Sequence, residues 1–362
     1  MNARIARLRL TLVNLSGPLS RWLDRIDLDR RKRLRGVRMV ASFSLAVALA
    51  LLVGPHMAGA YPASARTTSL ALLAGGFALW ASAQDTGRAT AAAAREILAL
   101  CLAATLGASV SIVLDGEWSL VLGALLAGGA RRRGGLVAAL ASQFFIGQLL
   151  ACAIPLQAGM APLAAVAGVL AAIAAVLPRL LSGAREKPSA PTVNHPCIDL
   201  ESSALEMALQ AAMPVLLLVA VDRVHGLLQP EWAMAAAVYV IASTRAETRR
   251  RCRRRVVGTA IGVLLALLYL PLAWHLPLLA WLAAAVGIVA YAMATPARYD
   301  VACGACSFTL VCLLAGSGEH SLALILARIW ETGVGTALGL LSVSVVHMRQ
   351  RRRGLGRSDS GG

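Results

Sequence analysis

Two ionisable residues lie within an apolar stretch near the end of the chain. Arg328 and Glu331 fall inside residues 320–346. At the centre of a bilayer an ionisable side chain costs at least ~2.5 kcal/mol, so it normally pairs with another group or faces water. Glu331 lies about eleven residues into the stretch, which at 1.5 Å per residue is ~16 Å deep and close to the midplane. Residues three apart share one face of a helix, so both groups are expected to point the same way.

This spacing allows two interpretations. Arg328 and Glu331 could form a structural ion pair within one helix. Alternatively, the forked guanidinium of Arg328 binds the carboxylate of a substrate while Glu331 exchanges the coupling proton. Arg66, four residues after Pro62 in another apolar stretch, is a third candidate for the same pathway. Its alternative is a side chain that extends to the membrane interface.

A glycine-threonine motif occurs twice in the second part of the chain. It comprises Gly258, Thr259 and Gly262, and again Gly335, Thr336 and Gly339. Glycines four residues apart leave a groove on a helix, into which a second backbone can pack closely, and threonine can satisfy its hydroxyl there. We therefore expect both motifs to be helix-packing sites. Closely packed helices can also slide or rock, as alternating access requires.

No other constellation indicates chemistry. Cys303 and Cys306 have the spacing of a metal or redox pair, but no second ligand pair accompanies them. The sequence contains no Walker motif, nucleophile elbow or paired acids. It predicts no enzymatic activity, no metal site and no cofactor.

The composition requires these residues to be positioned by membrane helices. The chain of 362 residues is 58% hydrophobic and only 15% charged, and its mean hydropathy is +0.69. A soluble fold of this length cannot bury so much apolar surface. A membrane helix needs about 20 apolar residues. Twelve candidate spans are 38–55, 63–83, 95–114, 117–131, 134–154, 160–178, 205–222, 231–244, 255–272, 275–294, 300–316 and 320–346.

These spans predict an all-α polytopic membrane protein of about twelve transmembrane helices, arranged as two parallel six-helix repeats. The predicted divisions are a basic arm (1–37), a first half (38–182), a linker (183–204), a second half (205–346) and a basic tail (347–362). Pro62 and Pro230 each open a span after a loop histidine, one in each half. Similar elements recur at an offset of about 160 to 170 residues, and an even number of spans per half makes the repeats parallel.

The distribution of basic residues predicts the orientation. All but three of the 35 Lys and Arg fall on one side of this arrangement, and the exceptions are Arg66, Arg223 and Arg328. Basic loops stay in the cytoplasm, so both termini are expected there. The run 245–255 is expected to join two helices and to contact anionic lipid headgroups rather than nucleic acid. Residues 58–60 form an alternative signal-peptidase site, which would remove the first span.

The second half also resembles a known family. Residues 207–346 resemble the fusaric acid resistance protein-like (FUSC-like) membrane domain of the aromatic acid exporter superfamily. The resemblance is carried by Pro230-Glu231-Trp232-Ala233, Tyr239-Val240, Thr248, Arg255, the motif at 258–262, Arg328, Thr332 and Gly335. The first half departs from the motif, with Ala104-Thr105-Leu106-Gly107 in its third span. Larger relatives also carry an extended soluble domain that has no counterpart in the short linker and tail here.

The resemblance implies a secondary exporter of aromatic or other hydrophobic organic acids, driven by the proton gradient, in a bacterial inner membrane. Two alternatives stay open, a passive organic-anion channel and a membrane scaffold without flux. The expected partners are a small organic-acid substrate and anionic lipid headgroups. Whether the chain forms a homo-oligomer is left open by the sequence.

Overall fold

The structure is a computed structural model that describes residues 31–57, 62–84, 90–114, 116–154, 156, 160–182, 203–242, 244–316 and 321–358. Several predictions lie outside the described residues. They concern most of the basic arm (1–30), the alternative cleavage site (58–60), most of the linker (183–202) and the last residues of the tail (359–362).

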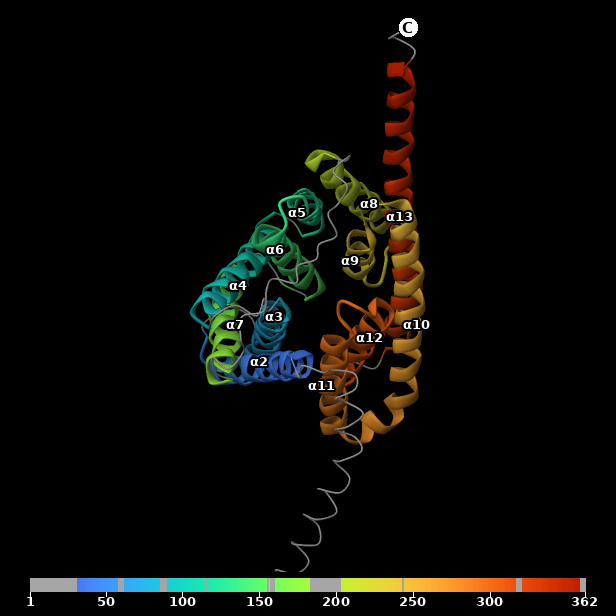
Figure 1. Ribbon diagram of the computed structural model, residues 1–362. Coiled ribbons are helices and arrows are strands. Elements are labelled where there is room, and N and C mark those ends of the chain that lie inside the picture. The colour runs from blue at the N-terminus through green and yellow to red at the C-terminus, as the bar shows by residue number, and fades with distance from the viewer. Residues whose placement is uncertain are drawn as a thin grey trace, which may run out of the picture.

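The described residues form twelve α-helices and one short 3-10 helix, one α-helix for each predicted span (Figure 1). The first half contains α2 (Arg31–Val53), η1 (Gly54–His56), α3 (Ala63–Ala83), α4 (Thr90–Val113), α5 (Glu117–Ala130), α6 (Gly135–Ala153) and α7 (Ala161–Leu181). The second half contains α8 (Ala204–His225), α9 (Pro230–Val240), α10 (Arg245–His275), α11 (Pro277–Ala294), α12 (Tyr299–Gly316) and α13 (Leu322–Ser358). The all-α prediction is confirmed.

The chain is a multi-pass membrane protein, although fewer helices qualify as spans than the twelve predicted. Within the described residues, eight helices are long and apolar enough to cross a membrane. They are α2, α4, α6, α7, α8, α10, α12 and α13. Two shorter apolar helices, α5 and α11, supplement them, and α9 has only 11 residues.

Local sequence signals set several helix ends. Ser203 and Glu206 form a capping box at the start of α8, with bonds of 3.1 and 2.8 Å. That helix ends at Gly226, whose φ of 64° is left-handed, a conformation that glycine adopts without a steric penalty. Pro230 begins α9, where its missing N–H has no helical partner to lose.

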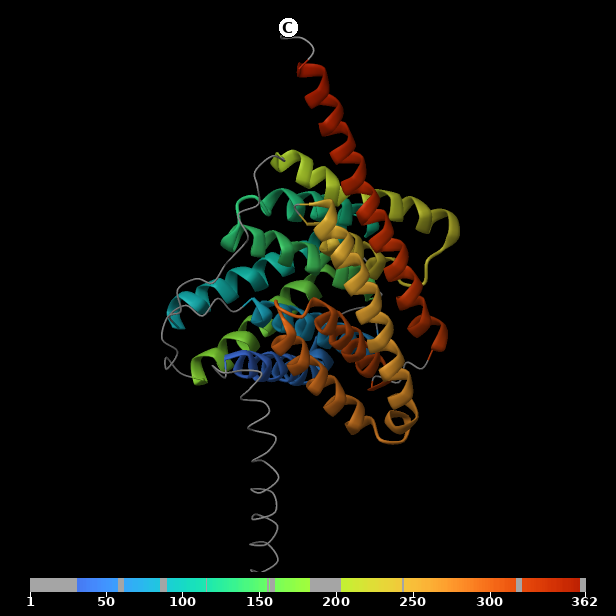
Figure 2. The same ribbon diagram turned by 45° about the vertical axis from the view of Figure 1, so that its right-hand side comes forward.

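The arginine run 245–255 is not the loop that the sequence analysis expected. It forms the first turns of α10, a helix of 31 residues. Thr244 caps this helix by accepting a hydrogen bond from the Glu247 backbone N–H at 3.2 Å, and Glu247 pairs with Arg251 one turn later at 3.2 Å. These contacts let a polar segment continue an apolar helix. Figures 1 and 2 also show α13 running past the other helices, because it continues from the apolar span through residues 347–358.

The helices pack in the same order in both halves. In the first half α2 contacts α3 and α7, α3 contacts α7, α4 contacts α6 and α7, and α5 contacts α6. In the second half α8 contacts α9 and α13, α9 contacts α13, α10 contacts α12 and α13, and α11 contacts α12. The halves meet along two seams, where α5 packs on α8 and α2 packs on α11 (Figure 1).

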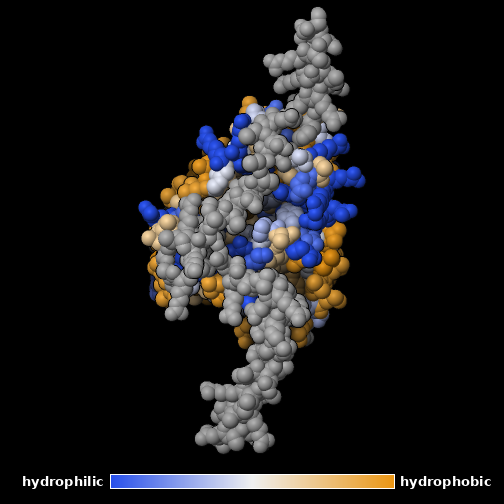
Figure 3. Space-filling model, in the orientation of Figure 1, coloured by the Kyte–Doolittle hydropathy of each residue, from blue (hydrophilic) through white to orange (hydrophobic). Residues whose placement is uncertain are grey.

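The described surface is largely apolar, as lipid contact requires. Large side chains such as Leu268, Leu278 and Leu52 are 80%, 70% and 68% exposed. Hydrophobic residues cover wide areas of the view in Figure 3, and hydrophilic ones gather at its upper right, beside α10. Arg249, Arg250 and Arg253 of α10 are exposed.

Candidate functional site

The short helix α9 lies between the two halves and organises the candidate site. Its 11 residues span about 16 Å, roughly half of a hydrocarbon core. It packs on α13 and α8 of its own half and on α6 and α5 of the other (Figure 1). A helix of this length cannot cross the membrane alone, so its two ends must be stabilised inside the protein.

The second glycine-threonine motif forms the packing surface for α9. A Cβ atom built on Gly335 would lie 2.1 Å from the carbonyl oxygen of Ala233, and one on Gly339 would lie 2.6 Å from that of Ala237. Each glycine therefore admits the backbone of α9 at a distance that no larger residue permits. Thr336, which lies between them, donates to the carbonyl of Gly333 one turn earlier at 2.9 Å.

The first motif performs the same role between α10 and α12. A Cβ atom on Gly258 would lie 2.2 Å from the carbonyl oxygen of Asp300, and one on Gly262 would lie 2.1 Å from that of Gly304. Thr259 is buried and accepts a hydrogen bond from Ser307 at 3.4 Å.

Glu331 holds the amino end of α9. Its Oε1 accepts hydrogen bonds from the backbone N–H groups of Leu228 and Gln229, at 2.8 and 3.1 Å. The side chain is fully buried, and Oε2 has no hydrogen-bond partner among the described residues. The partial positive charge of a helix amino terminus favours a carboxylate at this place.

Arg131 holds the carboxyl end of the same helix from the other half. Its two terminal nitrogens donate to the carbonyl oxygens of Ile241 and Val238, each at 2.9 Å. A cation is favoured at a helix carboxyl terminus, where the last carbonyls lack helical partners. The sequence analysis used Arg131 only as evidence of orientation, because no local signal shows that it reaches α9.

Arg328 stacks on an aromatic ring at the amino end of α9. Its guanidinium lies 4.2 Å from the centre of the Trp232 ring, and the residue is 5% exposed. Although the structure describes both residues, Arg328 and Glu331 form no ion pair, and Nε of Arg328 is without a hydrogen-bond partner. The direct contact of the first interpretation is therefore not formed: Glu331 contacts the backbone of the α8–α9 turn, and Arg328 contacts Trp232.

Arg66 is not brought to the same place. It lies in the first turn of α3, which packs within the first half, whereas Arg328 and Glu331 lie on α13. Its side chain is half-buried, and its Nε and one terminal nitrogen have no hydrogen-bond partner among the described residues.

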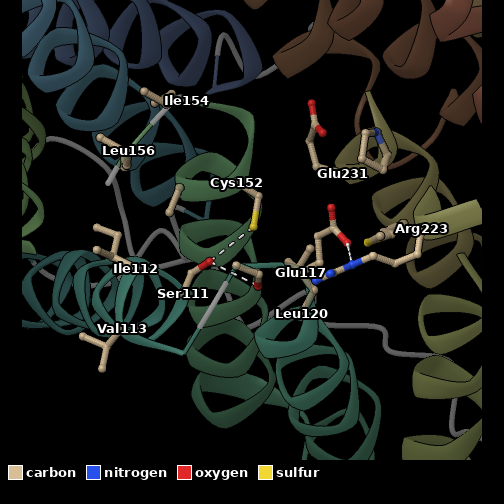
Figure 4. A pocket seen from close by; sticks show the side chains of 14 residues that line it. Ser111, Ile112, Val113, Glu117, Leu120, Cys152, Ile154, Leu156, Arg223 and Glu231 are labelled. Carbon is tan, nitrogen blue, oxygen red and sulfur yellow. Dashed lines mark hydrogen bonds and ion pairs between the residues drawn. The ribbon is translucent and has the colours of Figure 1, made fainter. Parts of the chain in front are cut away.

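A cavity of about 500 Å³ opens at the amino end of α9, between the two halves (Figure 4). Glu117 of α5 and Arg223 of α8 meet across the seam, with 3.5 Å between Oε2 and Nε. Glu231 of α9 also lines the cavity and is 8% exposed. The acidic and basic side chains of this lining are therefore two carboxyl groups and one guanidinium.

A second polar group lies at the carboxyl end of α9. We name Arg131, Tyr239, Arg255 and Tyr299 the basic cluster. All four side chains are half-buried, and Arg255 donates to the phenolic oxygen of Tyr299 at 3.2 Å. Tyr239 contacts Ser142 of α6 at 3.1 Å, which joins the cluster to the first half.

An apolar layer separates the cavity from the basic cluster. It contains Leu120 of α5, Phe145 of α6, and Met234 and Val238 of α9, each of them fully buried. Leu120 and Met234 belong to this layer and also line the cavity. The seam along α9 thus carries carboxyl groups together with Arg223 and Arg328 at one end, the basic cluster at the other, and tightly packed side chains between them.

The comparison with known families concerns the half that contains α9. Residues 215–342 match the fusaric acid resistance protein-like family. The resemblance predicted for residues 207–346 is confirmed over this range. This fusaric acid resistance protein-like region includes Glu231, Arg255, Arg328 and Glu331, whereas Arg131 lies before it. No curated protein and no solved structure matches the chain.

Proposed function

We propose that this chain is a secondary transporter that exports aromatic or other hydrophobic organic acids across a bacterial inner membrane, driven by protons. The observation that carries the proposal is the seam along α9. Two polar sites lie along this seam, one that contains carboxyl groups and one that is basic, and one apolar layer separates them. A transporter needs such a layer, because it binds substrate from one side while the other stays closed. The match to fusaric acid resistance protein-like proteins supports the same class.

The charge distribution supports the orientation. Basic loops remain in the cytoplasm, and the basic cluster belongs to the side that carries the runs 131–133 and 245–255. The cavity with Glu117 and Glu231 would then face the outside. A cytoplasmic organic anion would meet arginines first, and an external proton would meet carboxylates. Both termini would be cytoplasmic, and the exposed arginines of α10 would contact anionic lipid headgroups.

The packing order supports two parallel repeats. Most contacts between helices of the first half, among them α2–α3, α4–α6 and α5–α6, have counterparts between the helices six positions later, although α3–α6 has no comparable counterpart among the described residues. The seam α5–α8 corresponds to the seam α2–α11 in the same way. Glycine contacts recur as well, because Gly107 and Gly147 join α4 to α6 as Gly262 and Gly304 join α10 to α12. Two such halves can rock about an axis along the membrane normal.

Glu331 provides a physical link between a proton and the position of α9. As a carboxylate it accepts two backbone hydrogen bonds at the amino end of that helix. Protonation removes the charge, which weakens both bonds and the favourable interaction with the helix dipole. Arg328, stacked on Trp232, would hold a substrate carboxylate near the same end. Arg66 would act from α3 of the first half, separately from these two.

Uptake of radiolabelled benzoate into everted membrane vesicles tests the proposal. We expect uptake only in vesicles that contain the protein, and we expect a protonophore to abolish it. Uptake that follows the benzoate gradient and ignores the protonophore would identify a passive organic-anion channel. Absence of flux, together with a stable co-purifying partner, would identify a membrane scaffold.

A further inference from the structure

The basic cluster contains positive charge that no acid of the described residues neutralises. Arg131 and Arg255 form no ion pair with any carboxylate that the structure describes. The groups that interact most strongly with Arg255 are the phenol of Tyr299 and the thiols of Cys303 and Cys306, all neutral when protonated. Two partly buried cations without a counter-charge lose hydration without gaining an ion pair, so a bound anion would stabilise the cluster.

We propose that the basic cluster is the binding site for the carboxylate of an aromatic acid. The inference rests on the proposed function and states how its substrate is first recognised. Arg131 already gives both terminal nitrogens to α9, so it contributes charge and little else. Arg255 is the group that contacts the ligand.

Arg255 retains donors for a ligand. A guanidinium has five N–H donors, and here one nitrogen donates to Tyr299 at 3.2 Å while Nε is buried without a partner. Arginine binds carboxylates through two parallel hydrogen bonds, which its remaining donors can supply. The residue as a whole is half-buried, so part of the side chain remains exposed.

Aromatic rings beside Arg255 favour an aromatic ligand. The ring of Tyr239 lies 6.2 Å from that of Phe145, at an angle of 54°, and Tyr239 interacts electrostatically with both Arg131 and Arg255. Phe145 also belongs to the apolar layer. A ligand with a charged head and a flat apolar body would therefore place its carboxylate at Arg255 and its ring beside the half-buried Tyr239 and Tyr299.

The test is binding of 4-fluorobenzoate to the purified full chain in nanodiscs, followed by fluorine NMR. Arg255→Gln removes the proposed contact, and Arg255→Lys keeps the charge without the fork. Arg253→Gln is the matched control, because it removes the same charge from an exposed position on the same helix. Size-exclusion profiles show whether each variant folds. If Arg255→Gln does not fold, Arg255→Lys still tests the proposal.

We expect saturable binding in the wild type and in Arg253→Gln, and binding roughly 10- to 100-fold weaker in Arg255→Gln, the range for a charge-assisted hydrogen bond. Arg255→Lys should fall between them, and 4-fluorobenzamide should bind to none. The proposal would be overturned if the wild type did not bind 4-fluorobenzoate, or if Arg253→Gln and Arg255→Gln bound it equally. It would also be overturned if the amide bound as well as the acid, or if chloride at equal concentration displaced the acid. Intact binding without benzoate flux in vesicles would instead refute the proposed transport and leave this site in place.

Discussion

The contact between α13 and α9 offers a sharp test of the packing argument. A Cβ atom on Gly335 would lie 2.1 Å from the carbonyl oxygen of Ala233 and 3.0 Å from its Cα, so Gly335→Ala forces a collision with backbone. Gly333, two residues earlier on the same helix, has nothing within 4 Å of such a Cβ atom. The same substitution at these two positions should therefore have opposite effects.

The size of each effect follows from the geometry. An ordinary C–H···O contact has about 3.3 Å between carbon and oxygen, so Gly335→Ala must displace α9 by about 1 Å. Overpacking of this kind costs about 1–3 kcal/mol. At Gly333 alanine meets no obstacle, and its higher helix propensity should stabilise the protein by about 0.5–1 kcal/mol. The displacement should also loosen the hold of Glu331 on the amino end of α9.

The assay is thermal unfolding of the two purified variants in the same detergent. We expect a midpoint a few degrees below wild type for Gly335→Ala and at or above wild type for Gly333→Ala. Benzoate uptake into everted vesicles should fall in the first variant and persist in the second. A Gly335→Ala midpoint equal to or above that of Gly333→Ala would refute the close approach of α9 and α13.

Three further predictions concern charges along the seam. Arg131→Gln should destabilise the protein by about 2 kcal/mol in the same unfolding assay, because two charge-assisted bonds to α9 are lost, whereas exposed Arg132→Gln should have no effect. Glu331→Gln keeps an oxygen that can accept from the backbone, so it should cost only about 1 kcal/mol yet abolish proton-coupled benzoate uptake, and unchanged uptake would remove Glu331 from the mechanism. Arg253→Cys, in a chain whose seven native cysteines are replaced, should react with an impermeant maleimide in everted vesicles, and reaction in intact cells would reverse the proposed orientation.

The sequence predicted the helices well because hydropathy and helix ends are local properties. Each of the twelve spans corresponds to one helix within the described residues. The largest errors of position are the end of α13, at Ser358 rather than near residue 346, and the start of α10, at Arg245 rather than near residue 255. Hydropathy places the start of a span where the apolar residues begin, but a capped polar segment can extend the same helix into the headgroup region. The glycine motifs were also recognisable, since close packing requires small residues at a fixed spacing.

The sequence by itself therefore determined the membrane class, the order of the helices and the ionisable residues that lie within apolar spans. Only the tertiary structure decided what those residues contact. Arg131 reaches the end of α9 across 110 positions of the chain, and Glu331 reaches the start of α9 across 103. Arg255 meets Tyr299 in the same way. Such contacts depend on which helices pack together and at what height, and neither is encoded in the periodicity of any one helix.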